Sequence, residues 1–259
     1  MSSGRIRISS RDNALLVRVR RLNVTPDAYR QLGQVWLEGD HLVRAALARG
    51  WPLQELLLPA KREADAAVQS LWPQAQKVRV VDDALWAGIG SLASKAQVAA
   101  LAAWPGELPV LQGQSSVVLD RIQDAGNLGS ILRSAAALGV RQVIALKGCA
   151  ALWSPKVLRA GMGAHFALHL VEAVGEPELD GLDVPLVATS SYDGTSLTDV
   201  VLPDPCAWVF GHEGQGVAAS LLARCAVRTR IPQPGGEESL NVAAAAAVCL
   251  YESMRRRAQ

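Results

Sequence analysis

Hydrophobic residues along the chain follow two alternating patterns: short apolar runs, typical of buried strands, and a spacing of three to four residues, typical of helices. In the first part of the chain, strands are predicted at Gln34–Glu38, Leu53–Pro59, Lys77–Val81 and Val98–Trp104. Helical stretches are predicted between them, at Asp40–Arg49, Ala64–Leu71 and Asp82–Ala87. Residues 30–104 are therefore predicted to form a small α/β domain.

Residues 116–259 carry a second α/β pattern, whose predicted strands are near-continuous apolar runs, as expected of strands covered on both faces. These strands are Val117–Asp120, Gln142–Leu146, Phe166–Val171, Pro185–Ser190, Ala207–Gly211 and Val227–Ile231. Helical patterns separate most of them, so the sheet is predicted to be mainly parallel. Between the two patterns, residues 105–115 contain two prolines and two glycines and are predicted to be a linker.

Composition narrows the class of protein. The apolar runs are too short to span a bilayer, so no membrane segment is predicted, and the N-terminal residues lack the apolar core of a secretory signal. Four widely spaced cysteines without a Cys-x-x-Cys pair indicate buried free thiols, rather than a disulfide framework or a zinc site. We therefore expect a cytoplasmic protein.

Charge is distributed unevenly along the chain. The net charge is +2, but residues 1–30 contain seven arginines against two aspartates. Arginine forks suit phosphate oxygens, so residues 1–29 are predicted to form a basic arm that contacts nucleic acid. A solvated terminus without such contacts is an alternative of about equal weight.

The first predicted strand of the second domain leads into Asp120–Arg133, where a helix is expected to begin. Asn127 is predicted to cap this helix, because asparagine is a preferred N-cap residue. The apolar residues of the helix fall on one face, which leaves Arg133 pointing away from the sheet. Gly129, one turn earlier, leaves room for a ligand beside the guanidinium. A plain cap and a solvated surface arginine are the alternatives when each residue is taken alone.

A second strand end leads into the glycine-rich segment Gly211–Gly216, which contains His212, Glu213 and Gly214. Glycines allow close backbone approach, and ligands of open α/β sheets bind beyond the carboxyl ends of the strands. The neighbouring His212 and Glu213 could suggest a metal pair. No second pair with metal spacing accompanies them, so no metal is predicted.

The third strand end runs from Ile231 to Tyr251. A turn rich in proline and glycine leads into an acidic pair, then into Ser239-Leu240-Asn241 and five alanines. Ser239 or a neighbour is predicted to cap the last helix. The alanine run is consistent with close approach to another helix or subunit, and also with helix propensity alone.

Together, the patterns N-x-G-x-x-x-R, G-x-E-G-x-G and I-P-x-x-G-x-x-x-S-L-N, in this order, resemble the three motifs of the SpoU (TrmH) family of SPOUT-class RNA ribose 2′-O-methyltransferases. The resemblance covers residues 116–259. One departure is Asp124-Ala125, where many relatives carry Asp-Pro. Residues 30–104 resemble, more weakly, the ribosomal-protein-L30e-like substrate-binding domain of this family, on Val35-Trp36-Leu37-Glu38-Gly39 followed by a helix and an apolar strand.

The resemblance implies a deep trefoil knot in the parallel sheet, S-adenosylmethionine as methyl donor without a metal, and a homodimer with active sites between its subunits. The residues that match the family's contacts to the adenosine are Gly211, Ile231 and Leu240, with Thr189 and Gly214 as weaker candidates. The residues that match its catalytic and RNA-positioning set are Arg133, Asn127, Glu213, Ser239 and Asn241. Arg133 is the family's proposed base, yet an arginine essentially never loses its proton in a protein, so a positioning role is the alternative.

These observations predict a methyltransferase acting on the ribose 2′-hydroxyl of RNA. The basic arm and the L30e-like domain favour 23S (large-subunit) rRNA over tRNA. One alternative is a non-catalytic RNA-binding ribosome-assembly protein, and the presence of all five polar site residues argues against it. Another is a Rossmann-type nucleotide enzyme, which would need G-x-G-x-x-G after the first strand, where this chain has DAGNLG.

Overall fold

The structure is a computed structural model that describes residues 5–90, 96–190, 194–235 and 239–257. The chain divides into two compact units. Unit 1 comprises residues 1–106 together with the segment Trp153–Phe166, and unit 2 comprises residues 107–152 and 167–259. Each unit is described by itself below.

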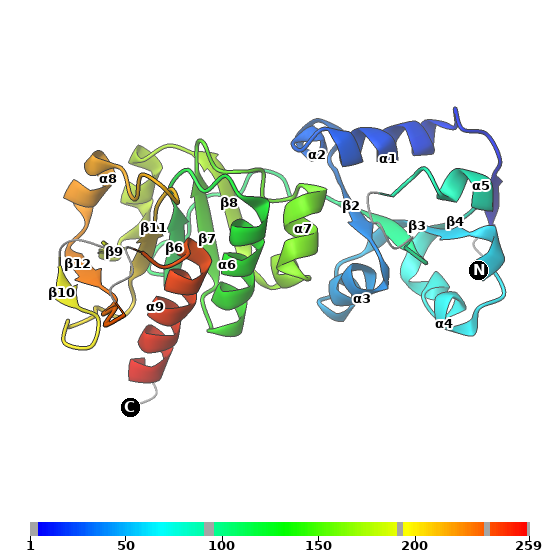
Figure 1. The fold of residues 1–259 in the computed structure, drawn as a ribbon. Helices are drawn as coiled ribbons and strands as arrows, with labels where there is room; N and C mark the ends of the chain where they lie inside the picture. The colour runs from blue at the N-terminus through cyan, green and yellow to red at the C-terminus, as the bar shows by residue number, and fades with distance from the viewer. Residues whose placement is uncertain (1–4, 91–95, 191–193, 236–238, 258–259) are drawn as a thin grey trace. The chain divides into compact units, whose positions relative to one another are not determined.

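Unit 1 is built on a mixed five-stranded sheet in the order β1-β4-β3-β5-β2 (Figure 1). Strands β1, β4 and β3 run parallel, whereas β5 is antiparallel to both β3 and β2. The strands are β1 (Ile6–Ile8), β2 (Gln34–Glu38), β3 (Leu53–Pro59), β4 (Ala75–Val81) and β5 (Ala99–Ala103). The helices are α1 (Ala14–Val24), α2 (Ala28–Leu32), α3 (Asp40–Ala48), α4 (Ala66–Gln69), α5 (Asp83–Trp86) and α7 (Pro155–Gly161), with the 3-10 turns η1 (Ala60–Arg62), η2 (Trp72–Gln74) and η3 (Ala164–Ala167). Residue pattern alone thus located β2 and β3 with the correct ends.

The N-terminal residues differ from the separate basic arm that charge suggested. Strand β1 pairs with β4, and α1 buries Leu15, Leu16, Val19 and Leu22. Arg5 and Arg7 form ion pairs with Glu63 and Asp82. The apolar residues between the arginines therefore make residues 5–29 an integral part of unit 1, because burying them outweighs the mutual repulsion of the charges.

The segment Trp153–Phe166 also departs from the sequence prediction, which gave it to the second domain with a strand from Phe166 to Val171. The rings of Trp153 and Phe166 pack on Trp51 of unit 1, at centroid distances of 5.4 and 5.2 Å. Phe166 therefore lies in a 3-10 turn, and the strand starts only at His169. An apolar run does not reveal whether it pairs in a sheet or fills an aromatic cluster.

Unit 2 is a seven-stranded, fully parallel sheet in the order β10-β12-β9-β11-β6-β7-β8, which confirms the predicted parallel α/β class. The strands are β6 (Ser116–Leu119), β7 (Gln142–Leu146), β8 (His169–Val174), β9 (Leu186–Thr189), β10 (Thr195–Ser196), β11 (Ala207–Phe210) and β12 (Val227–Arg230). The helices are α6 (Ala125–Ala137), the 3-10 helix η4 (Pro177–Leu182), α8 (Ala219–Arg224) and α9 (Val242–Arg257). The knot implied by the family resemblance stays a prediction.

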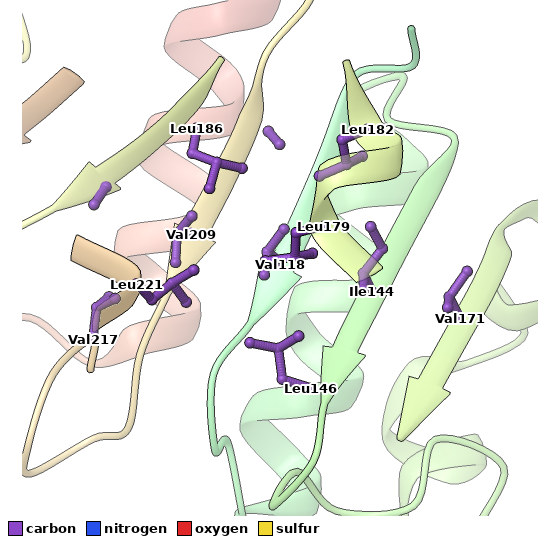
Figure 2. Close-up of a cluster of buried hydrophobic side chains, with 12 residues drawn as sticks. Val118, Ile144, Leu146, Val171, Leu179, Leu182, Leu186, Val209, Val217 and Leu221 are labelled. Carbon is purple, nitrogen blue, oxygen red and sulfur yellow. The ribbon is translucent and has the colours of Figure 1, made fainter. Parts of the chain in front are cut away.

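Both faces of this sheet are covered, which explains its continuous apolar strands. On one face, Val118, Ile144 and Val209 of three strands pack against Leu179 of η4 and Leu221 of α8 (Figure 2). On the other face, α6 and α9 lie side by side and bury their apolar residues. Helices α6 and α9 thereby bring the first and third sequence motifs together.

The four cysteines are free. Burial raises the pKa of the Cys149 and Cys206 thiols to about 11, so both remain protonated at neutral pH and are poor nucleophiles. No helix among the residues that the structure describes is long and apolar enough to cross a bilayer.

The end of α9 is held by a charge cluster that makes a pH-dependent contribution to stability. Glu252 accepts hydrogen bonds from Arg255 and Arg256, which lower the pKa of this carboxyl from 4.5 to about 2. Arg256 also donates to the carbonyl oxygen of Leu197. A carboxyl whose pKa is lower in the folded state stabilises the fold above its unfolded pKa, and this stabilisation is lost as the pH falls through the folded value.

Replacing Glu252 with glutamine is therefore expected to lower the free energy of unfolding at pH 7 by roughly 0.5–1 kcal/mol, the range of partly exposed ion pairs. The difference from the parent should shrink as the pH falls from about 4.5 towards 2. Urea unfolding at several pH values, followed by circular dichroism, measures it. A difference that stays constant over this range would contradict the assignment.

Candidate functional site

The first motif lies at the start of α6, where the structure corrects the predicted cap. Asp124, not Asn127, is the N-cap residue, and its Oδ1 accepts a hydrogen bond from the backbone N–H of Asn127 at 2.7 Å. Asn127 lies within the first turn of the helix. Its side chain is therefore not used by the cap and is available for contacts with other elements.

The second motif forms a compact loop after β11, here called the glycine loop (residues 211–216). Gly211 is buried, and a Cβ atom on it would lie 2.2 Å from the carbonyl carbon of Gly216. The N–H of Gly216 donates to the carbonyl oxygen of His212 at 2.8 Å, which closes the loop. Only glycine fits at position 211, and the closure leaves Glu213 exposed at the tip.

The third motif reaches the site through the start of α9. Asn241 caps this helix, since its Oδ1 accepts from the N–H groups of Ala243 and Ala244 at 2.9 and 3.3 Å. The sequence predicted that Ser239 or a neighbour caps this helix, and in the structure the cap is the neighbour Asn241 and not Ser239. The acidic pair at 237–238 lies outside the described residues.

A directional chain of hydrogen bonds joins the three motifs. Asn241 Nδ2 donates to Asn127 Oδ1 at 2.9 Å, and Asn127 Nδ2 donates to Glu213 Oε1 at 3.1 Å. Because the cap requires the oxygen of Asn241 to face the helix N–H groups, the amide nitrogen of Asn241 must face Asn127. Asn127 then presents its own nitrogen to the carboxylate. The helix cap therefore sets the orientation of the whole chain from Asn241 to Glu213.

Two predicted site residues are not joined to this chain. Arg133 and Ser239 are exposed, and neither side chain makes a hydrogen bond or ion pair with any of the residues the structure describes. Arg133 lies two turns further along α6 than Asn127, on the solvent side of the helix. The structure therefore brings together Asn127, Glu213 and Asn241, and leaves the guanidinium of Arg133 without a partner among the residues that it describes.

The predicted cofactor residues gather at one edge of the sheet. Thr189, Gly211 and Ile231 end or directly follow β9, β11 and β12, and β9 is the central strand of these three. Gly214 lies in the glycine loop, where its N–H donates to His212 Nδ1 at 3.0 Å. Leu240 is 41% exposed, directly before the cap of α9.

Two features of this edge are compatible with a small-molecule ligand. First, the backbone N–H and C=O groups of Ile231 and Leu240 make no hydrogen bond within the described part of the chain, so they can serve the polar edge of a base. Second, an apolar groove with a volume of about 400 Å³ includes Ile231, Pro232, Val248 and Tyr251 in its lining. Apolar surface with a few free polar groups is the usual make-up of a small-molecule site.

Sequence reasoning missed two residues of the site, Asp120 and Arg121, and assigned no structural role to His212. Asp120 is a carboxylate only 5% exposed, and its Oδ2 accepts from the N–H of Ala218 at 2.8 Å. His212 Nδ1 accepts from the N–H groups of the glycine loop and is not arranged for a metal. The one available signal was Asp120 itself, a charged residue directly after a buried strand.

No group of three or more potential metal ligands occurs among the described residues. The described side chains of the site comprise a carboxylate, two carboxamides and a nearby guanidinium. These groups can position a hydroxyl and a phosphate and can help to remove a proton.

Comparisons with known proteins identify the family of this chain. Residues 114–251 match the model of the SpoU rRNA Methylase family. An uncharacterised tRNA/rRNA methyltransferase of Synechocystis sp. is 34% identical, over 96% of this chain and 94% of the relative. The 23S rRNA (guanosine(2553)-2′-O)-methyltransferase RlmP of Bacillus subtilis is 30% identical, over 83% of this chain and 86% of the relative. The crystal structure of the SpoU methyltransferase AviRb from Streptomyces viridochromogenes, in complex with AdoMet, superposes with a TM-score of 0.86 at 26% identity, over 95% of this chain and 99% of AviRb.

Proposed function

This chain belongs to the SpoU rRNA methylase family, and on that basis we propose that it transfers a methyl group from S-adenosylmethionine to a ribose 2′-hydroxyl of large-subunit rRNA. The observation that carries the proposal is the hydrogen-bond chain Asn241–Asn127–Glu213, in which each of the three motifs supplies one side chain. This hydrogen-bond chain is polar and directional, and it is open to solvent at Glu213.

We propose that S-adenosylmethionine binds at the ends of β9, β11 and β12, with the adenine edge on the free backbone groups of Ile231 and Leu240. Thr189, Gly211 and Gly214 line the same sheet edge. When bound, this cofactor supplies a methyl group that is already activated by its positive sulfonium. The protein then has two remaining tasks: to align the hydroxyl and to assist the loss of its proton.

In our proposal, different residues of the site perform these two tasks. Asn127 occupies Oε1 of Glu213, so Oε2 of that carboxylate is left to accept a hydrogen bond from the ribose or from a guanidinium. A guanidinium keeps its proton in proteins, so Arg133 holds a phosphate or the ribose and stabilises negative charge on the reacting oxygen. Ser239, close in sequence to Asn241, holds the ribose from the third motif.

Large-subunit rRNA is the favoured substrate because the relative RlmP, which matches this chain over most of its length, is named as a 23S rRNA enzyme. The arginines of residues 5–30 give unit 1 a basic surface for RNA phosphates, of which Arg11 and Arg21 are exposed. A substrate of this kind places the protein in the cytoplasm. The alternative substrate is tRNA.

The test of this function uses purified protein, tritiated S-adenosylmethionine, and 23S rRNA and tRNA from a strain that lacks the gene. We expect label in 23S rRNA, and mapping of 2′-O-methyl positions against the parent strain then identifies the nucleotide. Label confined to tRNA would select the alternative substrate. Cofactor binding without transfer to either RNA would instead favour a ribosome-assembly role.

We also propose that the active unit is a homodimer in which Arg133 serves the site of the partner subunit. Helix α9 exposes the apolar residues Val248 and Tyr251 to 42% and 54%, and both line the apolar groove together with Ile231. Burying such a face needs a partner surface, and a second copy supplies one together with its own Arg133.

Mixing two inactive variants tests this arrangement. If Arg133 acts across the interface, dimers that combine Arg133→Ala with Glu213→Ala contain one intact site and one doubly altered site. Unfolding and refolding the mixture should then restore about a quarter of the parent activity, because half of the dimers are mixed and each has one working site. If both residues act within one subunit, every site keeps one defect and no activity returns.

A further inference from the structure

Arg121 adopts a backbone conformation that an arginine rarely occupies. It follows Asp120 at the end of β6 and has a φ of +57°, in the left-handed region that favours glycine. This conformation costs a non-glycine residue on the order of 1 kcal/mol. Interactions of the side chain must therefore offset this cost.

The side chain of Arg121 reaches the glycine loop. Its Nη1 donates to Gln215 Oε1 at 2.7 Å, and its Nη2 donates to the carbonyl oxygen of Gly216 at 3.3 Å. Both acceptors lie within three residues of Glu213. The guanidinium thus contacts the loop on which the site carboxylate is carried, although Arg121 is more than 90 residues away in the sequence.

Asp120 orients the guanidinium and also holds the chain just after the glycine loop. Its Oδ1 accepts from Arg121 Nε at 3.0 Å and its Oδ2 from Arg121 Nη2 at 3.1 Å. The same Oδ2 accepts the N–H of Ala218 at 2.8 Å. A carboxylate that is 5% exposed, with these three hydrogen bonds, is a fixed anchor for the planar fork of the arginine.

Asp120 and Arg121 together form a clamp on the glycine loop, and two further contacts complete it. Gly148, itself at a φ of +95°, leaves space for the stem of Arg121, because a Cβ atom there would lie 3.1 Å from Arg121 Cγ. Inside the loop, His212 Nδ1 accepts from the N–H groups of Gly214 and Gln215 at 3.0 and 3.3 Å. The loop is therefore tied from within by His212 and from outside by Arg121.

We propose that Arg121 is a positioning residue for methyl transfer: its guanidinium, anchored on Asp120, holds the glycine loop in the conformation in which Glu213 meets Asn127. This proposal rests on the proposed function for its catalytic part. Arg121 acts through Glu213, and the contacts it makes are to the loop. The backbone strain at position 121 is offset by the hydrogen bonds that the side chain makes.

The substitution Arg121→Gly removes the side-chain contacts of the clamp but keeps the backbone conformation, because glycine accepts a φ of +57° without strain. We expect kcat to fall by about 10–50-fold and KM for RNA to change less than about threefold, as for a loop that is misplaced but folded. Thermal stability should fall only modestly, because relief of the backbone strain partly offsets the loss of the cationic partner of the buried Asp120. Arg121→Lys keeps the charge but not the fork, and should recover only part of the loss.

Ala173→Gly is the matched control. Ala173 has a φ of +60° and is exposed on β8, so the substitution makes the same backbone change without removing a polar side chain. We expect its kcat to equal that of the parent. Parent-like kcat in Arg121→Gly, or an equal loss in Ala173→Gly, would overturn the proposal.

Two further measurements separate positioning from general support of the fold. In a Glu213→Gln background, Arg121→Gly should lower kcat by less than about twofold, because the group through which it acts is already altered; independent, multiplicative losses would count against the proposal.

Hydrogen exchange at the N–H groups of Gly214 and Gln215, measured without RNA or cofactor, should be about tenfold faster in Arg121→Gly. Unchanged exchange would refute the clamp. If exchange accelerates in Arg121→Gly but the parent protein methylates no RNA, the clamp is supported and the proposed function is refuted.

Discussion

Replacing Arg133 with alanine is expected to lower the rate of methyl transfer by about 10³-fold or more, while the affinity for S-adenosylmethionine changes by less than about threefold. The size follows from the loss of a fixed positive charge next to an oxygen that gains negative charge, an effect of about 10²–10³ in other enzymes, together with the loss of alignment. The affinity is spared because Arg133 lies on the solvent side of α6, outside the groups that line the proposed cofactor edge.

Single-turnover transfer of labelled methyl to RNA measures the rate, and isothermal titration measures cofactor affinity. Arg141→Ala is the matched control: Arg141 is also an exposed arginine of unit 2, but it directly precedes β7 and so lies at the opposite edge of the parallel sheet. It should transfer methyl at the parent rate. Near-normal turnover in Arg133→Ala would remove Arg133 from the active site.

Asn241→Asp is expected to lower kcat by about 10²-fold without destabilising the protein. Aspartate caps a helix as well as asparagine does, so α9 keeps its two cap hydrogen bonds and its stability within about 0.5 kcal/mol. The donor to Asn127 is lost, however, because both side-chain atoms of aspartate are acceptors. If Asn127 turns its amide to serve the new carboxylate, its oxygen then faces the carboxylate of Glu213, and the hydrogen bond to Glu213 is lost.

The control for this experiment is the same substitution at a cap outside the site. Asn13 caps α1, where its Oδ1 accepts from the N–H of Leu15 at 3.0 Å. Asn13→Asp should change neither stability nor kcat. Thermal unfolding and single-turnover kinetics of the two variants, side by side, test both expectations. A loss of stability in Asn241→Asp that is large enough to explain its loss of activity would show that the residue supports only the helix.

Spacing along the sequence was sufficient to identify the parallel sheet and the segments that carry the site. Apolar runs marked β7 with its correct ends and β11 to within one residue, because strands buried on both faces need continuous apolar residues. The polar residues after those strands were correctly expected at one edge, since parallel strands end on the same side of a sheet.

Local pattern failed where two residue types could serve the same role. Asn127 and Asp124 are both good N-cap residues, and the choice of Asp124 depends on where the chain leaves β6. The positive φ of Arg121 was invisible for a similar reason, since no local rule places an arginine in a conformation suited to glycine. Only the tertiary contacts with Asp120 and Gln215 show what the residue does there.

The sequence by itself therefore determined the fold class and predicted which segments carry the site, because hydrophobic period and residue chemistry are properties of the chain. The tertiary structure alone decided how those side chains meet. It joined Asn241, Asn127 and Glu213 in one directed chain, left Arg133 apart from them, and assigned the N-terminal arginines to a folded unit. The physical reason is that hydrogen-bond direction and helix-face position depend on contacts between residues far apart in the chain, 114 and 86 positions for the two hydrogen bonds of the site, which no local pattern encodes.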